Sequence, residues 1–95
     1  MAQIALSYAK SGNPDQAEAF IRRARTQDKN DLNILYSEAQ VNALLGKQIE
    51  ALELLQDALE KHYSAEAMVG DPDLNNLRNN PEFNSLIKKY SKKGP

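Results

Sequence analysis

The side chains that could perform acid–base, nucleophilic or metal chemistry are few in this sequence. His62 is the only histidine, and Glu66 follows it at the spacing that places two ligands on one face of a helix. Two ligands are too few for a zinc site, and the sequence offers no second pair at such a spacing. Ser64 lacks the strained turn and the orienting third group of a catalytic triad. We therefore expect no metal, no cofactor and no enzymatic activity.

Asp71 and Asp73 are close enough in the sequence to form a pair of carboxylates with an acid–base role. Pro72 between them, however, creates the order that is typical of a helix start: an N-cap, a proline in the first turn and then an acid. The same order recurs over Asn80–Glu82. We therefore interpret both segments as helix caps. The glycines are widely separated and form no phosphate-binding loop.

Two clusters of basic side chains could contact a phosphate backbone or an acidic partner. They are Arg22, Arg23 and Arg25 in the first half of the chain and Lys88, Lys89, Lys92 and Lys93 near its end. The alternative is a solvated helix face, because the helix dipole favours lysine at the C-terminal end. The net charge is −1, and Tyr90 is the only aromatic side chain among the lysines. Binding of nucleic acid through the lysine-rich C-terminus is therefore the least favoured function.

The elements that must position these side chains are helices, because apolar residues recur every three to four positions. Gly12 and Gly46 can each adopt the left-handed conformation that ends a helix, and Asn13 and Asp31 are suited to cap the helices that follow. The predicted helices cover about residues 4–11, 13–27, 31–46 and 48–62. They form two helical hairpins in series.

The two hairpins are related by a shift of 34 residues. The residues that coincide under this shift are small or apolar, whereas chance coincidences would involve residues of all types. The sequence therefore contains a repeat. The coincident pairs are Gly12 and Gly46, Ala17 and Ala51, Ala24 and Ala58, Ala5 and Ala39, Ala9 and Ala43, Phe20 and Leu54, and Ile21 and Leu55. The repeats are assigned to residues 1–31 and 32–65.

These positions resemble the signature of the tetratricopeptide repeat family. Gly12, Ala17, Ile21 and Ala24, with their partners in the second hairpin, match the family's glycine, alanine, large apolar residue and alanine, and Tyr8 matches its tyrosine. Lys29 and Tyr63 replace the family's proline at the repeat ends, and Asn42 replaces the second tyrosine. The resemblance implies an all-α fold, with antiparallel hairpins stacked as a short right-handed α-solenoid.

Residues 66–93 depart from the period and are expected to form helices that cap the second repeat. Their apolar face would consist of Leu74, Leu77, Phe83, Leu86 and Ile87. The run DPDLNNLRNNPEFNSLIKKY is similar to the segment that closes many bacterial tetratricopeptide regions. Those regions are often attached to serine/threonine kinases, adenylate cyclases or winged-helix regulators. The resemblance therefore suggests an arm of a larger signalling protein.

The family's geometry implies a peptide-binding groove lined by the first helix of each hairpin. Side chains spaced along one stripe of these helices are Leu6, Lys10, Asn33, Tyr36, Gln40 and Leu44. Tyr36 and Leu44 would be exposed apolar anchors, and the polar members would bind a peptide backbone or carboxylate. The alternative is that Tyr36 and Leu44 pack against neighbouring helices.

The length of 95 residues and a composition of 41% hydrophobic and 26% charged residues predict one soluble domain over residues 1–95. The sequence has no cysteine and no apolar run long enough to cross a membrane, and its first five residues lack the basic and apolar regions of a signal peptide. We therefore expect a cytoplasmic protein. The favoured function is non-catalytic binding of a protein or peptide. The alternative is a structural or regulatory arm that docks on other domains of its own chain. The apolar N-terminal helix, with Ala2, Ala5 and Leu6, also predicts a homodimer.

Overall fold

Every regular element in residues 2–91, which this computed structural model describes, is a helix. The elements are α1 (Ala2–Lys10), α2 (Pro14–Gln27), α3 (Leu32–Leu44), α4 (Gln48–Glu60), α5 (Ala65–Val69), the 3₁₀ helix η1 (Pro72–Leu77) and α6 (Pro81–Ser91). The all-α prediction is confirmed, and the first four helices lie within a few residues of their predicted bounds.

The turns inside the two hairpins have the same backbone geometry. Gly12 and Gly46 have φ angles of +80° and +82°, a region that glycine reaches without steric cost. The N–H of Asn13 donates to the carbonyl of Tyr8 at 2.8 Å, and the N–H of Lys47 donates to the carbonyl of Asn42 at 2.9 Å. These bonds satisfy carbonyls that a helix end would otherwise leave without partners. The predicted glycine stops are confirmed.

The predicted N-caps form in three places out of four. The Asp31 carboxylate accepts from the N–H of Asn33 at 2.8 Å, Asp71 accepts from that of Asp73 at 2.9 Å, and Asn80 accepts from that of Glu82 at 2.8 Å. Asn13 occupies the N-cap position of α2, but its side chain caps no backbone N–H of the helix. Proline in the first turn still sets the start of α2, because its fixed φ suits that position.

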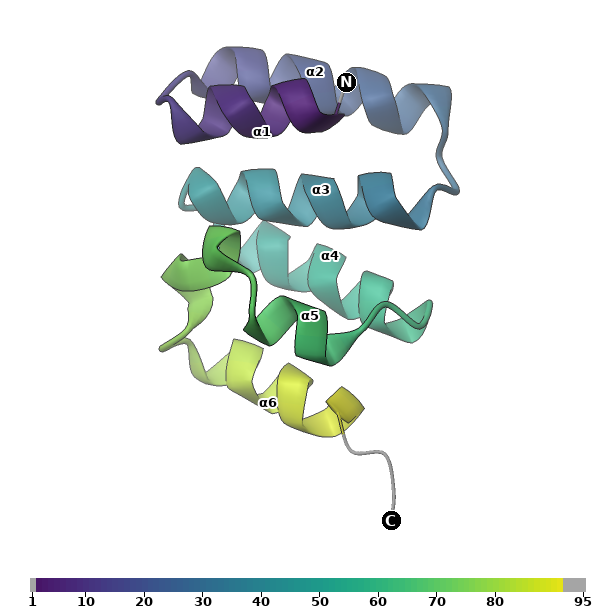
Figure 1. The fold of residues 1–95 in the computed structure, drawn as a ribbon, viewed down its shortest axis with the longest axis vertical. Helices are drawn as coiled ribbons and strands as arrows, with labels where there is room; N and C mark the ends of the chain where they lie inside the picture. Colours follow the sequence, from purple (N-terminus) through teal and green to yellow (C-terminus); the bar gives the residue numbers. More distant parts are fainter. Residues whose placement is uncertain (1, 92–95) are drawn as a thin grey trace.

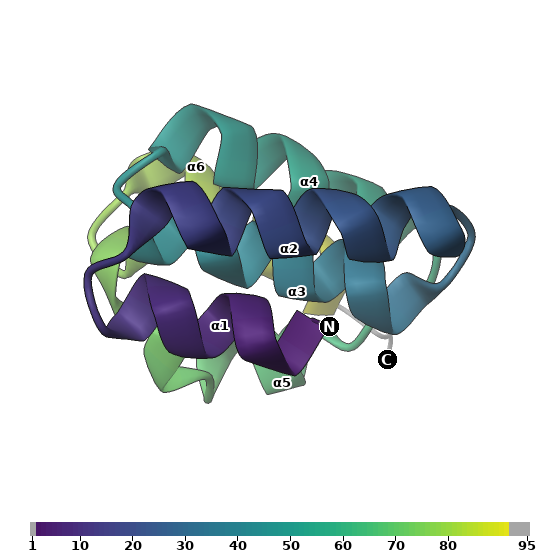
Figure 2. The ribbon, with the colours of Figure 1, turned by 90° about the horizontal axis from the view of Figure 1, so that it is seen from above.

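Helix α3 lies at the centre of the molecule. It contacts α1, α2, α4 and η1. Figure 1 shows α1, α3 and α5 on the near side with α2 and α4 behind them, and Figure 2 shows α3 between α1 and α4. Buried side chains occur all around α3 rather than on one stripe. Most of the surface of α3 is therefore covered, although Asn33 is exposed and Glu38 and Asn42 are half-buried.

Two hydrophobic clusters hold the helices together. The smaller one joins α1 and α2 to Val41 of α3. The larger one joins α3 and α4 to the C-terminal segment, where Met68, Leu74, Leu77 and Phe83 are each at most 4% exposed. Leu86 and Ile87 pack against this cluster while remaining partly exposed. Residues after α4 are therefore part of the main core.

The alanines at the hairpin interfaces generate a first prediction. Ala17 and Ala51 are fully buried, whereas Ala19 is exposed on α2. We expect Ala17→Leu and Ala51→Leu to cost about 1–3 kcal/mol each, because extra methylene groups cannot fit without moving a helix. Ala19→Leu should change the free energy of unfolding by less than about 0.5 kcal/mol. Urea titration followed by circular dichroism measures all three, and equal losses would contradict the assigned packing.

The buried leucines of η1 generate a second prediction. Leu77 is fully buried, while Asn79 two residues later is exposed. Leu77→Ala should lower the free energy of unfolding by about 2–5 kcal/mol, because it removes buried methyl groups and leaves a cavity. Asn79→Ala is the matched control and should have little effect. If thermal melting showed the two variants to be equally stable, residues 71–91 would not belong to the core.

Candidate peptide-binding site

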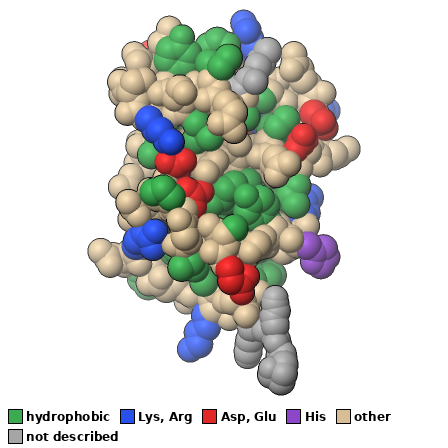
Figure 3. Space-filling view, in the orientation of Figure 1, with side chains coloured by type: hydrophobic (Ala, Val, Ile, Leu, Met, Phe, Trp, Pro, Cys, Tyr) green, Lys and Arg blue, Asp and Glu red, His purple; other side chains and the backbone are tan. Residues whose placement is uncertain are grey.

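The face formed by α1 and α3, where the sequence predicts a groove, contacts the chain's own Asp71 and Asp73. The Tyr36 hydroxyl donates to the Asp71 carboxylate at 2.5 Å, and the Gln40 amide donates to the same group at 2.7 Å. Lys10 of α1 forms an ion pair with Asp73 at 3.3 Å. In Figure 3, acidic and basic side chains lie together on the left of this face. Two of the polar groups expected to bind a peptide, Lys10 and Gln40, therefore bind the start of the η1 segment instead.

Tyr36 is buried rather than exposed, which corrects the expectation of an open apolar anchor. Its side chain is 6% exposed, and its ring stacks on Tyr63 with the ring centres 4.1 Å apart. Burial raises the pKa of Tyr36 far above its ordinary value, and the hydrogen bond to Asp71 raises it further. Burial also raises the pKa of Tyr63. The Tyr36 hydroxyl therefore remains protonated, and a donor to Asp71, above the pH at which an ordinary tyrosine ionises.

The other predicted groove residues have different surroundings. Leu6 is 7% exposed and packs in the cluster of α1 and α2, and Leu44 packs against the same cluster. Asn33 is exposed near the start of α3, away from the contacts to η1. The structure thus brings Lys10, Tyr36 and Gln40 together, but it does not join the six residues into one open groove.

The segment that covers α3 is anchored too firmly to act as a movable lid. Leu74 and Leu77 of η1 are 1% and 0% exposed. Exposing a buried leucine costs about 1.5–3 kcal/mol, so releasing η1 would cost several kcal/mol before any polar contact is counted. Gln48 and Asn76 add hydrogen bonds between η1 and the α3–α4 hairpin. We therefore treat the α1/α3 face as filled by the chain itself.

The outer edge of the first hairpin carries few exposed apolar groups. Ile4 is 46% exposed, whereas Ala5 and Leu6 lie in the core. Tyr8 and Phe20 stack with ring centres 5.5 Å apart, and Arg23 covers the Phe20 ring. This corrects the expected role of Leu6 at the edge, because a charge introduced there would unfold the hairpin. Ile4 is the side chain through which self-association of α1 can be tested.

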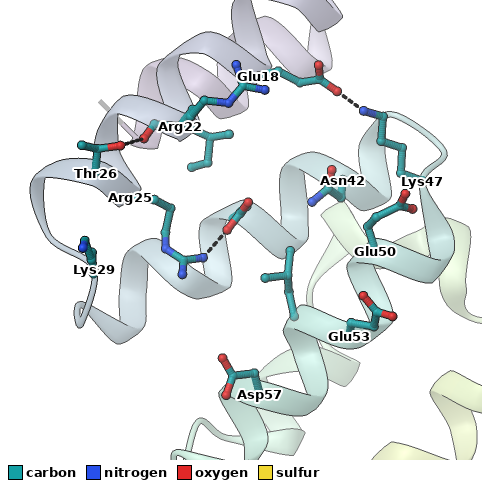
Figure 4. Close-up of a pocket in the computed structure, with 13 residues that line it drawn as sticks. Glu18, Arg22, Arg25, Thr26, Lys29, Asn42, Lys47, Glu50, Glu53 and Asp57 are labelled. Atoms are coloured by element: carbon teal, nitrogen blue, oxygen red, sulfur yellow. Dashed lines mark hydrogen bonds and ion pairs between the residues drawn. The ribbon is translucent and has the colours of Figure 1, made fainter.

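A cleft of about 620 Å³ opens between α2 and α4, with α3 as its floor. Figure 4 shows its charged side chains projecting from the two helices toward the space between them. The α2 wall and the turn after it carry Glu18, Arg22, Arg25 and Lys29, and the α4 wall and the turn before it carry Lys47, Glu50, Glu53 and Asp57. Ile21, Thr26, Glu38, Asn42 and Leu54 complete the lining.

The two walls carry opposite charges in matching order. Positions 18, 22, 25 and 29 are three or four residues apart, as are positions 47, 50, 53 and 57. The members within α2 and α4 therefore form one stripe on each helix, and Lys29 and Lys47 lie in the adjoining turns. The order on the α2 side is one acid followed by three bases, and on the α4 side one base followed by three acids. The cleft therefore has a mainly basic wall opposite a mainly acidic wall.

Only part of this charge is used inside the molecule. Lys47 pairs with Glu18 across one end of the cleft, and Arg25 pairs with Glu38 on the floor. Asp57 pairs with Lys61 at 2.6 Å. Among the residues that the structure describes, no ion pair involves Arg22, Lys29, Glu50 or Glu53. Two basic and two acidic groups of the cleft are thus free to bind a ligand.

Sequence reasoning recognised the arginines of α2 but missed the acidic wall. It interpreted Arg22 and Arg25 as a basic cluster, with nucleic acid as one ligand. In the structure these arginines lie opposite Glu50 and Glu53, which would repel a phosphate backbone. The signal that could have found the site was the spacing of the acids on α4. This spacing indicates a site only when the structure shows that α4 lies beside α2.

Other ligand classes receive no support from the residues that the structure describes. Within residues 2–91, His, Asp and Glu side chains nowhere gather in a group of three that could hold a metal ion. None of the described helices combines the length and apolar character needed to cross a membrane. Lys88 and Lys89 are exposed in the last turn of α6, and Lys92 and Lys93 lie outside the described residues.

Comparisons with protein-family models, curated proteins and solved structures found no match. The function must therefore be argued from the geometry of the chain itself.

The contact between α3 and η1 generates a third prediction. Tyr36→Phe should lower the free energy of unfolding by about 1 kcal/mol at neutral pH, because Asp71 loses one donor. Above pH 10, the ordinary pKa of tyrosine, the unfolded chain ionises Tyr36 while the folded chain keeps it protonated. Because the pKa of Tyr36 is higher in the folded chain than in the unfolded chain, the wild-type protein loses stability as the pH rises above 10.

The variant Tyr36→Phe lacks the ionisable hydroxyl and therefore does not lose stability in this way. The difference in the free energy of unfolding between the two proteins should narrow above pH 10. Urea titrations of both proteins across the alkaline range measure the effect. A constant difference at all pH values would contradict the assigned role of the hydroxyl.

Proposed function

We propose that this chain is a non-catalytic protein-interaction module that binds a segment of a partner protein in the cleft between α2 and α4. The observation that carries the proposal is the opposition of the two charged walls. Arg22 and Lys29 on the basic side and Glu50 and Glu53 on the acidic side form no ion pairs among the described residues. Unpaired charges held on helices recognise a complementary partner with little loss of conformational freedom.

The proposed architecture is a short right-handed α-solenoid of the tetratricopeptide type with a C-terminal cap. Equivalent burial of residues 34 positions apart supports it. Ala17 and Ala51 are both fully buried, and Ile21 and Leu55 are 5% and 0% exposed. The matching turns at Gly12 and Gly46 support the same interpretation. In this arrangement the proposed cleft lies on the second helices of the hairpins rather than on the first.

The cleft supports binding better than the α1/α3 face does. Tyr36, Gln40 and Lys10 are engaged by Asp71 and Asp73, and a partner would have to displace η1 from the core to reach them. The cleft needs no such rearrangement, because its volume of about 620 Å³ is open in the folded chain. This volume lies within the range of about 300–1,000 Å³ typical of ligand sites.

A second candidate function is a structural arm that docks on another domain. It is favoured by the side chain of Ile49, which is 71% exposed beside a groove of about 560 Å³ between α4 and α6. Leu52 and Leu86 line the same groove. Isolated apolar side chains are common on protein surfaces, however, and the cleft offers more defined chemistry. A cytoplasmic location and a homodimer through α1 also remain proposals.

The proposed function generates a fourth prediction, which tests the cleft directly. The immobilised chain should capture a specific protein from a cell lysate, and the double variant Arg22→Ala/Glu53→Ala should capture much less of it. The matched control is Arg23→Ala/Glu60→Ala, which removes the same charges outside the cleft. Circular dichroism establishes that both variants are folded. Equal capture by the wild-type chain and the cleft variant would exclude this site.

A further inference from the structure

The cleft also indicates what kind of segment it binds. We propose that its ligand is an extended peptide in which acidic and basic side chains alternate, with the acidic side chains toward α2 and the basic ones toward α4. This inference rests on the proposed function and deepens it, because it names the chemistry of the partner.

The charge on the walls determines how the ligand is oriented. Arg22 and Lys29 attract carboxylates to the α2 side, and Glu50 and Glu53 attract ammonium or guanidinium groups to the α4 side. A uniformly acidic or uniformly basic segment would be attracted by one wall and repelled by the other. Only a segment with opposite charges on its two sides is attracted by both walls.

An extended chain presents two such sides naturally. Successive side chains of a β-strand point in opposite directions, so strict alternation of acid and base separates the charges onto two faces. Asn42 lies on the floor between the walls, and its side chain makes no hydrogen bond to the residues that the structure describes. Its amide can both donate to and accept from the backbone of an extended peptide. A helical ligand would leave this amide unused, because its own backbone groups are already paired.

The cleft sets the length of the segment. Glu18 lies nine positions before Gln27, the last residue of α2, which corresponds to about 14 Å along the helix, and Lys29 follows in the turn. An extended peptide rises about 3.3 Å per residue, so about five residues fit along the walls. The pair formed by Glu18 and Lys47 bridges the walls at one end. A peptide of six alternating residues therefore covers the walls with about one residue to spare.

The fifth prediction compares two labelled, end-capped hexapeptides of identical composition. One alternates Glu and Lys, and the other has three Glu followed by three Lys. Fluorescence anisotropy at low ionic strength should show the alternating peptide binding the full chain about tenfold more tightly, since several exposed charge pairs of modest strength act together. Equal affinity for the two peptides would overturn the inference.

A charge-reversal variant makes the test specific. Glu50→Lys/Glu53→Lys renders both walls basic, so it should bind the alternating peptide about tenfold more weakly and gain affinity for a hexapeptide that alternates Glu and Gly. Glu60→Lys/Glu66→Lys carries the same change in net charge outside the cleft and should behave as the wild-type chain. Circular dichroism again establishes folding.

Unchanged peptide preference in Glu50→Lys/Glu53→Lys would also overturn the inference. Its failure is distinguishable from failure of the proposed function. If the hexapeptides bind equally while lysate capture still depends on Arg22 and Glu53, the cleft binds a partner of other chemistry. If lysate capture is also independent of the cleft, both proposals are wrong.

Discussion

The structure depends on the need to cover most of the surface of α3. Its buried residues include Leu35, Tyr36 and Val41, which point in different directions around the helix. Such a helix is stable in water only when neighbouring helices exclude solvent from its apolar side chains. Alanines make the close approach possible, since Ala39 and Ala43 of α3, Ala17 of α2 and Ala51 of α4 are all fully buried. The positions of α1, α2, α4 and η1 follow from this requirement.

Covering α3 explains why the face shared with α1 is not a free groove. The short η1 segment places Leu74 and Leu77 in the core, and its N-terminal Asp71 then lies beside Tyr36 and Gln40. Asp71 accepts hydrogen bonds from Tyr36 and Gln40, and it also caps η1 by accepting from the N–H of Asp73. A polar group next to a buried tyrosine needs such partners, and the chain supplies them itself.

The same packing leaves the charged cleft open. Helices α2 and α4 both pack on α3 rather than on one another. Their facing stripes are complementary in charge, but among the described residues only Glu18 and Lys47 join the two walls. The ion pair of Arg25 with Glu38 ties the basic wall to the floor and leaves the opposing wall unbound. A separation imposed by α3 is therefore what turns two charged helix faces into a site for a third component.

The sequence by itself determined the helices, their caps and most of the core. Glycine stops, proline starts and the spacing of apolar residues act over a few neighbouring positions, so Gly12, Asp31 and Pro81 could be interpreted without knowledge of the fold. The buried alanines were predicted for the same reason. Only the tertiary structure decided which surface is open. Tyr36 meets Asp71 across 35 positions, and the charges on α2 and α4 face each other only because both helices pack on α3. Neither contact can be predicted from neighbouring residues in the sequence, because each depends on how separate helices are placed in space.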